Sequence, residues 1–340
     1  MNNSNDVKLL PPMSVFSTIR KGLDTVAAYP ELVVPPILLD LFLWFGPRLT
    51  SRALFQRIAD LVSESIRTAP TLDTEFSQQM AAQLDLFIEL VGQFGERFNI
   101  FWGLSNFPIA VPSSMIGILP FLPGRMPLAN PLGRPMIIEI PMQIPAIVLV
   151  SLPILVVGMG LGTLYHRWIA SKTDQAEELV PFFIGWIRVL LLAALLGSVG
   201  FVLMFGILFV VGLVNLILGP QIGILVMGLG FSLLLGAIIY LFFTPYAIIR
   251  NRRNILIAML DSFNIVRINI IGTLFYLLTA GGLLHLTNMV WLMPEDGSWY
   301  TLLGIVGHGF ISSVLIASGY IFYQDRMVFL ENLKKRLFSA

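Results

Sequence analysis

Asp40 is the residue whose chemistry conflicts most with its surroundings. It stands between Leu39 and Leu41, near the middle of an apolar run. A carboxylate inside a bilayer costs a few kcal/mol, so it is usually paired, neutral or functional. Two roles are open. Asp40 could form an ion pair with Arg188, which lies at a comparable depth early in the third apolar run, or it could couple to a proton or cation.

Two histidines form the second candidate. His285 and His308 fall at similar depth on neighbouring antiparallel apolar runs. Facing imidazoles could ligate the metal of a haem or chlorin, or relay a proton. Alternatively, each bonds a neighbouring helix through the nearby polar side chains of Thr287, Asn288, Ser312 and Ser313. Two histidines without supporting spacing do not define a cofactor site, so we expect no cofactor and no bound metal.

The sequence contains no motif that names a reaction. There is no G-x-S-x-G or H-E-x-x-H, and Gly158-Met-Gly160-Leu-Gly162 lacks the preceding strand and following Lys-Ser/Thr of a phosphate loop. The absence of cysteine excludes disulfides, thiolate zinc sites and iron–sulfur clusters. A net charge of +1 without a basic stripe argues against a nucleic-acid partner. We therefore expect no catalytic residues and no enzyme.

Six apolar runs must position these residues. The mean hydropathy is +0.83 and only 12% of residues are charged, which is outside the range of soluble proteins. A helix needs about 20 mainly apolar residues to cross a bilayer. The sequence thus predicts an all-α, polytopic helical bundle. Its six predicted spans are Leu32–Leu49, Ile144–His166, Ile187–Leu216, Ile222–Ile249, Asn269–Leu292 and Trp299–Tyr323.

The distribution of Lys and Arg predicts the orientation. Basic residues occupy the N-terminal segment 1–31, the short loops after the second and fourth spans, and the tail 324–340. The loops Gly219–Gln221 and Met293–Ser298 contain none. The positive-inside bias therefore predicts a multi-pass protein of the cytoplasmic membrane with both termini in the cytoplasm. Segment 50–143 then forms an extracytoplasmic insert, and 144–323 holds spans 2–6.

Three spans are expected to begin with an amphipathic helix. Met13–Ala28 has one apolar face and a cationic pair at Arg20 and Lys21, which favours a helix in the inner interface. Ala176–Arg188 and Asn254–Ile268 precede the third and fifth spans in the same way. The pattern predicts three units, each an in-plane helix, a span outward and a span back.

The insert is expected to have two parts. Ser51–Arg67 and Asp73–Phe98 keep helical spacing of apolar residues and predict a hairpin of amphipathic helices. Ser105–Pro145 is apolar but carries nine prolines, which prevent a regular helix. Backbone that cannot pair with itself cannot enter lipid, so this segment should cover the outer mouth of the bundle, dock on the amphipathic hairpin or bind a partner. The side chains expected to do so are Phe107, Ile116, Leu119, Phe121 and Leu122.

The bundle resembles uncharacterised bacterial six-helix families similar to the membrane domain that accompanies some glycerophosphodiester phosphodiesterases. The likeness rests on six spans with cytoplasmic ends, the lead-in helices, and the stretch from Ser262 to Asn269 that enters a span. It does not cover the insert, and no phosphodiesterase domain is present in this sequence. The resemblance implies an accessory membrane role without catalysis.

Two functions follow as hypotheses. The first is a non-catalytic accessory or scaffold component of a cytoplasmic-membrane complex, with the insert binding a partner. The second is a transport permease, such as the membrane subunit of an ATP-driven exporter, to which an ATPase would dock on the cytoplasmic loops. The lipid bilayer is the partner common to both.

Overall fold

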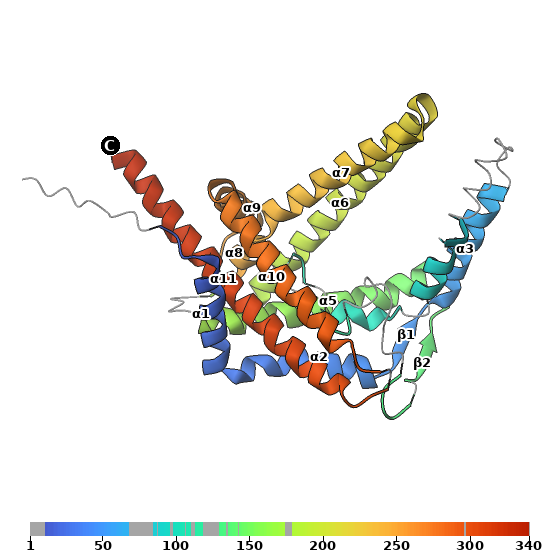
Figure 1. Ribbon diagram of the computed structural model, residues 1–340, viewed down its shortest axis with the longest axis horizontal. Helices are drawn as coiled ribbons and strands as arrows, with labels where there is room; N and C mark the ends of the chain where they lie inside the picture. The colour runs from blue at the N-terminus through green and yellow to red at the C-terminus, as the bar shows by residue number, and fades with distance from the viewer. Residues whose placement is uncertain are drawn as a thin grey trace, which may run out of the picture.

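Over the residues that it describes, the computed structural model is about 81% helical and contains no closed sheet (Figure 1). It describes residues 11–67, 84–86, 88–95, 98–105, 107–109, 113–117, 129–133, 135–141, 143–173, 179–295 and 297–339.

Five helices are long and apolar enough to cross a membrane within the described residues. They are α5 (Ile144–Lys172), α6 (Phe182–Leu218), α7 (Pro220–Leu241) with its continuation α8 (Thr244–Arg250), α10 (Ile270–Trp291) and α11 (Thr301–Ser339). They correspond to predicted spans 2–6. The helix α9 (Ile255–Ile268) precedes α10. The chain is therefore an all-α protein compatible with embedding in a membrane.

The first predicted span is not a single straight helix. Val15–Ala28 forms α1, Pro30–Val33 forms the 3₁₀ turn η1, and Val34–Phe45 forms α2. The two α-helices are bent by 99° at this break. Twelve residues of α2 span only about 18 Å, short of the about 30 Å of a hydrocarbon core. Pro30, Pro35 and Pro36 explain the break, because proline supplies no N–H to a preceding turn.

The N-terminal helix α1 packs against α11 and does not lie alone in the interface. The chain just before α1 is bonded to α11 at Met13. The Met13 N–H donates to Asp325 Oδ2 (3.0 Å), and the Met13 carbonyl accepts from Arg326 Nη2 (2.9 Å). Further along, Gly22 leaves no room for a side chain against the Val314 carbonyl. The expected lead-in helix thus belongs to the bundle, because its apolar face finds a protein partner there.

The helices α6 and α7 form a hairpin that projects away from the other helices (Figure 1). The 37 residues of α6 span about 55 Å at about 1.5 Å per residue. Among the described residues, contacts of this hairpin with the main core end near Leu196 and Ile239. Beyond them, Gly223 and Gly230 are buried only where the two helices meet each other. Residues 197–238 are called the outer hairpin below.

Two apolar clusters hold the rest together. The main core joins α1, α5, α8, α9, α10 and α11 and includes stacked rings of Phe243, Tyr276 and Phe322. A second cluster lies beneath the insert and includes Trp44, Trp102 and Ile305. It connects α2 and α11 to the segment that follows the insert helices.

The insert contains helix α3 (Arg52–Arg67) and a second helical stretch within 84–95. The two helical stretches meet where the Phe55 ring contacts the rings of Phe94 and Phe98. Strands β1 (Arg48–Thr50) and β2 (Ile137–Glu139) pair in parallel and tie the start of the insert to its end. A Glu139 oxygen also accepts from the Ala53 N–H at the start of α3.

Candidate functional site

The described residues 98–105, 107–109 and 113–117 pack into the bundle without forming an α-helix. Among them, the 3₁₀ turn η2 (Ile100–Ser105) packs along α5, with the Gly103 carbonyl against Gly158. Further along, the Phe107 ring stacks on His166 of α5 with centroids 4.1 Å apart. His166 lies 22 residues into α5, about 33 Å from its start at about 1.5 Å per residue. We call the described residues 98–105, 107–109 and 113–117 together the re-entrant segment.

Two of the residues predicted to cover the bundle or bind a partner pack against the interior of the chain. Phe107 is part of the main core, and Ile116 is buried in the second cluster. Non-helical backbone is tolerated at membrane depth where protein surrounds it, and α2, α5 and α11 provide that surrounding. The other predicted cover residues, Leu119, Phe121 and Leu122, lie outside the described residues.

Asp40 supplies the hydrogen bonds that this irregular backbone needs. Its fully buried carboxylate accepts from Ser114 Oγ (2.5 Å), Met115 N (2.9 Å) and Ile116 N (3.0 Å). Ser114 Oγ in turn accepts from the Gly117 N–H (2.7 Å). Burying an amide N–H or a carboxylate without a hydrogen-bond partner costs free energy. Here the two amides and the carboxylate are one another's partners. The arrangement holds the returning part of the re-entrant segment on α2.

The predicted ion pair between Asp40 and Arg188 is wrong. Arg188 Nη1 instead donates to the carbonyls of Arg252 (2.7 Å) and Arg253 (2.9 Å). These carbonyls follow α8, at a turn where Arg252 has a positive φ of 52°. A guanidinium suits such a place because it can bond several carbonyls at the end of a helix. Arg188 therefore joins α6 to the α8–α9 connection.

Arg250, the last residue of α8, has a role that sequence reasoning missed. The buried Arg250 donates to the Ala170 carbonyl (3.3 Å) and to Thr173 Oγ1 (3.4 Å), at the end of α5. A cation at this end also complements the helix dipole. The sequence reading assigned this basic cluster to orientation. The spacing of the apolar runs already places this cluster beside helix ends, and that position could have indicated the role of Arg250.

The two membrane histidines do not face each other. His285 is exposed on α10, whereas His308 is fully buried on α11 with its Nδ1 2.8 Å from Asn288 Oδ1. This geometry matches the helix–helix hydrogen bond left open as the alternative. The described residues contain no group of three His, Cys, Asp or Glu side chains that could hold a metal.

His166, to which sequence reasoning assigned no role, is the third histidine. It is buried in the main core, with Nδ1 3.2 Å from the Tyr320 hydroxyl. Its neighbour Tyr165 bonds Ser313 (2.7 Å), which links α5 to α11. The buried polar groups of this core thus connect helices to one another.

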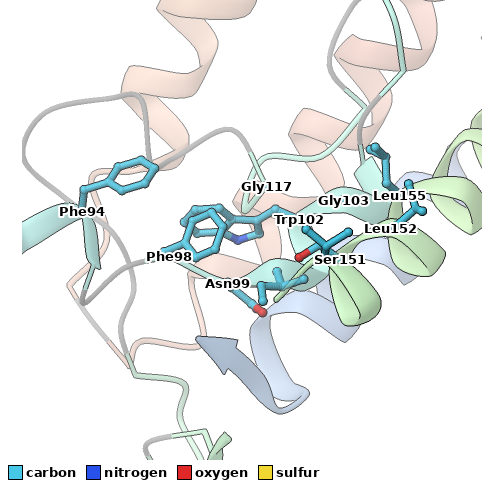
Figure 2. Close-up of a pocket in the computed structure, with 11 residues that line it drawn as sticks. Phe94, Phe98, Asn99, Trp102, Gly103, Gly117, Ser151, Leu152 and Leu155 are labelled. Carbon is cyan, nitrogen blue, oxygen red and sulfur yellow. The ribbon is translucent and has the colours of Figure 1, made fainter. Parts of the chain in front are cut away.

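A pocket of about 410 Å³ lies between the re-entrant segment and the first turns of α5 (Figure 2). Eleven described residues line it, and none of these is charged: Phe94, Phe98, Asn99, Ile100, Trp102, Gly103, Gly117, Val148, Ser151, Leu152 and Leu155. Figure 2 shows Phe98 and Trp102 facing Ser151 and Leu152 across the space. Asn99 is buried there and fixes the wall, because its Oδ1 accepts from Leu49 N (3.1 Å) and Phe101 N (3.2 Å).

No family model matches the chain, and neither do any curated proteins or solved structures. The fold and the site define a class only: an all-α protein with several apolar helices compatible with a membrane. The resemblance to the membrane domain beside glycerophosphodiester phosphodiesterases stays a prediction.

Proposed function

We propose that this protein is a non-catalytic scaffold component of a complex in the cytoplasmic membrane. Its termini lie in the cytoplasm and its insert lies outside, where it binds a partner. The partners are other helical membrane proteins, with lipid surrounding the remaining surface.

The observation that carries the proposal is the outer hairpin. Residues 189–249 contain no Asp, Glu, Lys, Arg or His, so this surface can contact only lipid or apolar protein. A ridge of exposed rings runs along α6 at helical spacing: Phe201, Phe205 and Phe209 are 61%, 58% and 68% exposed. Large exposed aromatic side chains are typical of protein interfaces.

The insert offers a second apolar surface. Leu132, Met136, Ile137 and Ile138 are exposed beside the parallel pair β1–β2. Parallel sheets are normally covered on both faces, and exposed apolar patches mark interaction sites. This supports the insert as the outer partner surface.

Asp40 weighs against a transport role, because its carboxylate is fully buried and engaged by three donors. One feature favours the alternative of a transport permease. The break between α1 and α2 resembles the discontinuous helices at transporter sites. That break is filled, since Leu32 is buried and its carbonyl accepts from Ser313 (3.4 Å).

Quantitative affinity purification from membranes in mild detergent tests the proposal. We expect the full chain to retain an integral membrane protein in fixed stoichiometry. The triple variant F201A/F205A/F209A should lose it, because truncating a central aromatic side chain commonly costs more than about 2 kcal/mol of binding.

The matched control is L225A/L229A/L233A, three exposed α7 residues at the same spacing. Equal loss in both variants would indicate a damaged hairpin and contradict the ridge as the interface. Co-purification of an ATPase, unaffected by either variant, would favour the permease.

A further inference from the structure

We propose that the pocket between the re-entrant segment and α5 binds one acyl chain of an outer-leaflet phospholipid. The inference rests on the outward position of the insert in the proposed function. It concerns a ligand site and not the partner surface of the outer hairpin.

The lining sets the chemistry of the occupant. The described residues that line the pocket carry no charged side chain and are mostly apolar, so the complementary occupant is an uncharged hydrocarbon. Trp102, which is only 7% exposed, and Phe98 form a rigid aromatic wall, with ring centroids 5.7 Å apart. Pockets of about 300–1,000 Å³ with apolar, aromatic walls are typical ligand sites, and 410 Å³ lies within this range.

The position sets the source. The lining residues of α5 lie 4–11 residues after its start at Ile144, which corresponds to depths of about 6–17 Å at about 1.5 Å per residue. In the proposed orientation this is the depth of the outer-leaflet acyl chains, about half of a hydrocarbon core of about 30 Å. An acyl chain at this depth can belong to a diacyl lipid that lies beside the helix.

The mouth opens toward that lipid. Val148 and Leu152 line the pocket and are nevertheless 52% and 55% exposed, so they form its edge on the free face of α5. Leu149, one residue away on the same helix, is 75% exposed and does not line the pocket. An acyl chain can therefore enter sideways from the bilayer past the apolar side chains of Val148 and Leu152.

Photolabelling of the full chain in phosphatidylcholine nanodiscs tests the proposal. The probe is a trace of phosphatidylcholine with a diazirine in one acyl chain, and mass spectrometry locates the label. We expect label to concentrate on 98–103 and 148–155 relative to the exposed faces of α6 and α7. S151F, which places a ring in the pocket, should reduce it about tenfold, the factor for a loss of about 1.4 kcal/mol in binding free energy.

The matched control L149F adds a ring on the same helix outside the pocket and should label like the natural chain. V148W, at the exposed mouth, gives a second blocking variant if S151F does not fold. Label spread evenly over all exposed apolar faces, and unchanged in S151F or V148W, would overturn the site. Displacement by a lipidated peptide but not by excess phosphatidylcholine would overturn the phospholipid as its source. Neither result depends on whether a protein partner co-purifies.

Discussion

At the scale of single residues, the buried polar side chains of this bundle form hydrogen bonds with the backbone of the same chain. Asp40 satisfies the amides of a segment that cannot form a helix, and Arg188 and Arg250 satisfy carbonyls at helix ends. A buried charge is tolerable when such bonds replace those of water. These residues therefore determine where segments join.

Replacing Asp40 should be costly. D40A leaves two buried amides and a hydroxyl without their acceptor, at about 1–3 kcal/mol for each unsatisfied group. We expect a loss of about 3 kcal/mol or more in the free energy of unfolding, measured as a lowered Tm in a thermal-shift assay. L38A, on the exposed side of α2, is the control and should change Tm little.

The double variant D40A/R188A distinguishes the observed contacts from an ion pair. Since Asp40 and Arg188 have separate partners, their effects on stability should add within about 0.5 kcal/mol. A double variant more stable than D40A alone would restore the ion pair.

At the scale of elements, close backbone approach allows irregular and helical segments to share the interior. Gly158 is the point of contact: a Cβ there would overlap the Gly103 carbonyl of η2. The outer hairpin shows the opposite case, because the space beside Gly197 is open. Glycine therefore permits a close backbone contact at Gly158 of α5, whereas Gly197 of α6 makes no such contact.

Two alanine variants test this contrast. G158A should destabilise the fold by about 1–3 kcal/mol, as overpacking of an interior does. G197A should be neutral or stabilising by up to about 1 kcal/mol, because alanine is the better helix former. Thermal shift of both variants in one detergent is the measurement. A stabilised G158A would mean that η2 does not lie on α5.

At the scale of the whole molecule, Figure 1 shows the outer hairpin projecting from a core to which α1, α10 and α11 belong. The basic loops around α8 lie at the junction of α5 and α6 with this core. The arrangement supports the proposed orientation, in which this junction faces the cytoplasm.

Single-cysteine labelling checks that orientation, since the chain has no native cysteine. The exposed positions Leu132, in the insert, and Lys335, near the end of α11, are suitable. With an impermeant maleimide on intact cells, L132C should label and K335C should label only after lysis. The reverse pattern would invert the topology.

The sequence by itself determined the helical class, and it predicted the five apolar runs that form helices long and apolar enough to cross a membrane. An apolar run of about 20 or more residues without charge can form few structures other than a membrane helix. These features depend on composition and short-range spacing, which a single sequence carries.

Only the tertiary structure decided the partner of each polar group. The ion pair of Asp40 with Arg188 and the facing histidines were inferred from depth, and depth does not fix which way a side chain points around a helix. The bend after α1 and the re-entrant segment depend on contacts between residues far apart in the chain, such as Phe107 with His166 and Asp40 with Met115. Such contacts decide the fold wherever local backbone preferences leave hydrogen bonds unmade, because buried amides must find an acceptor somewhere in the protein.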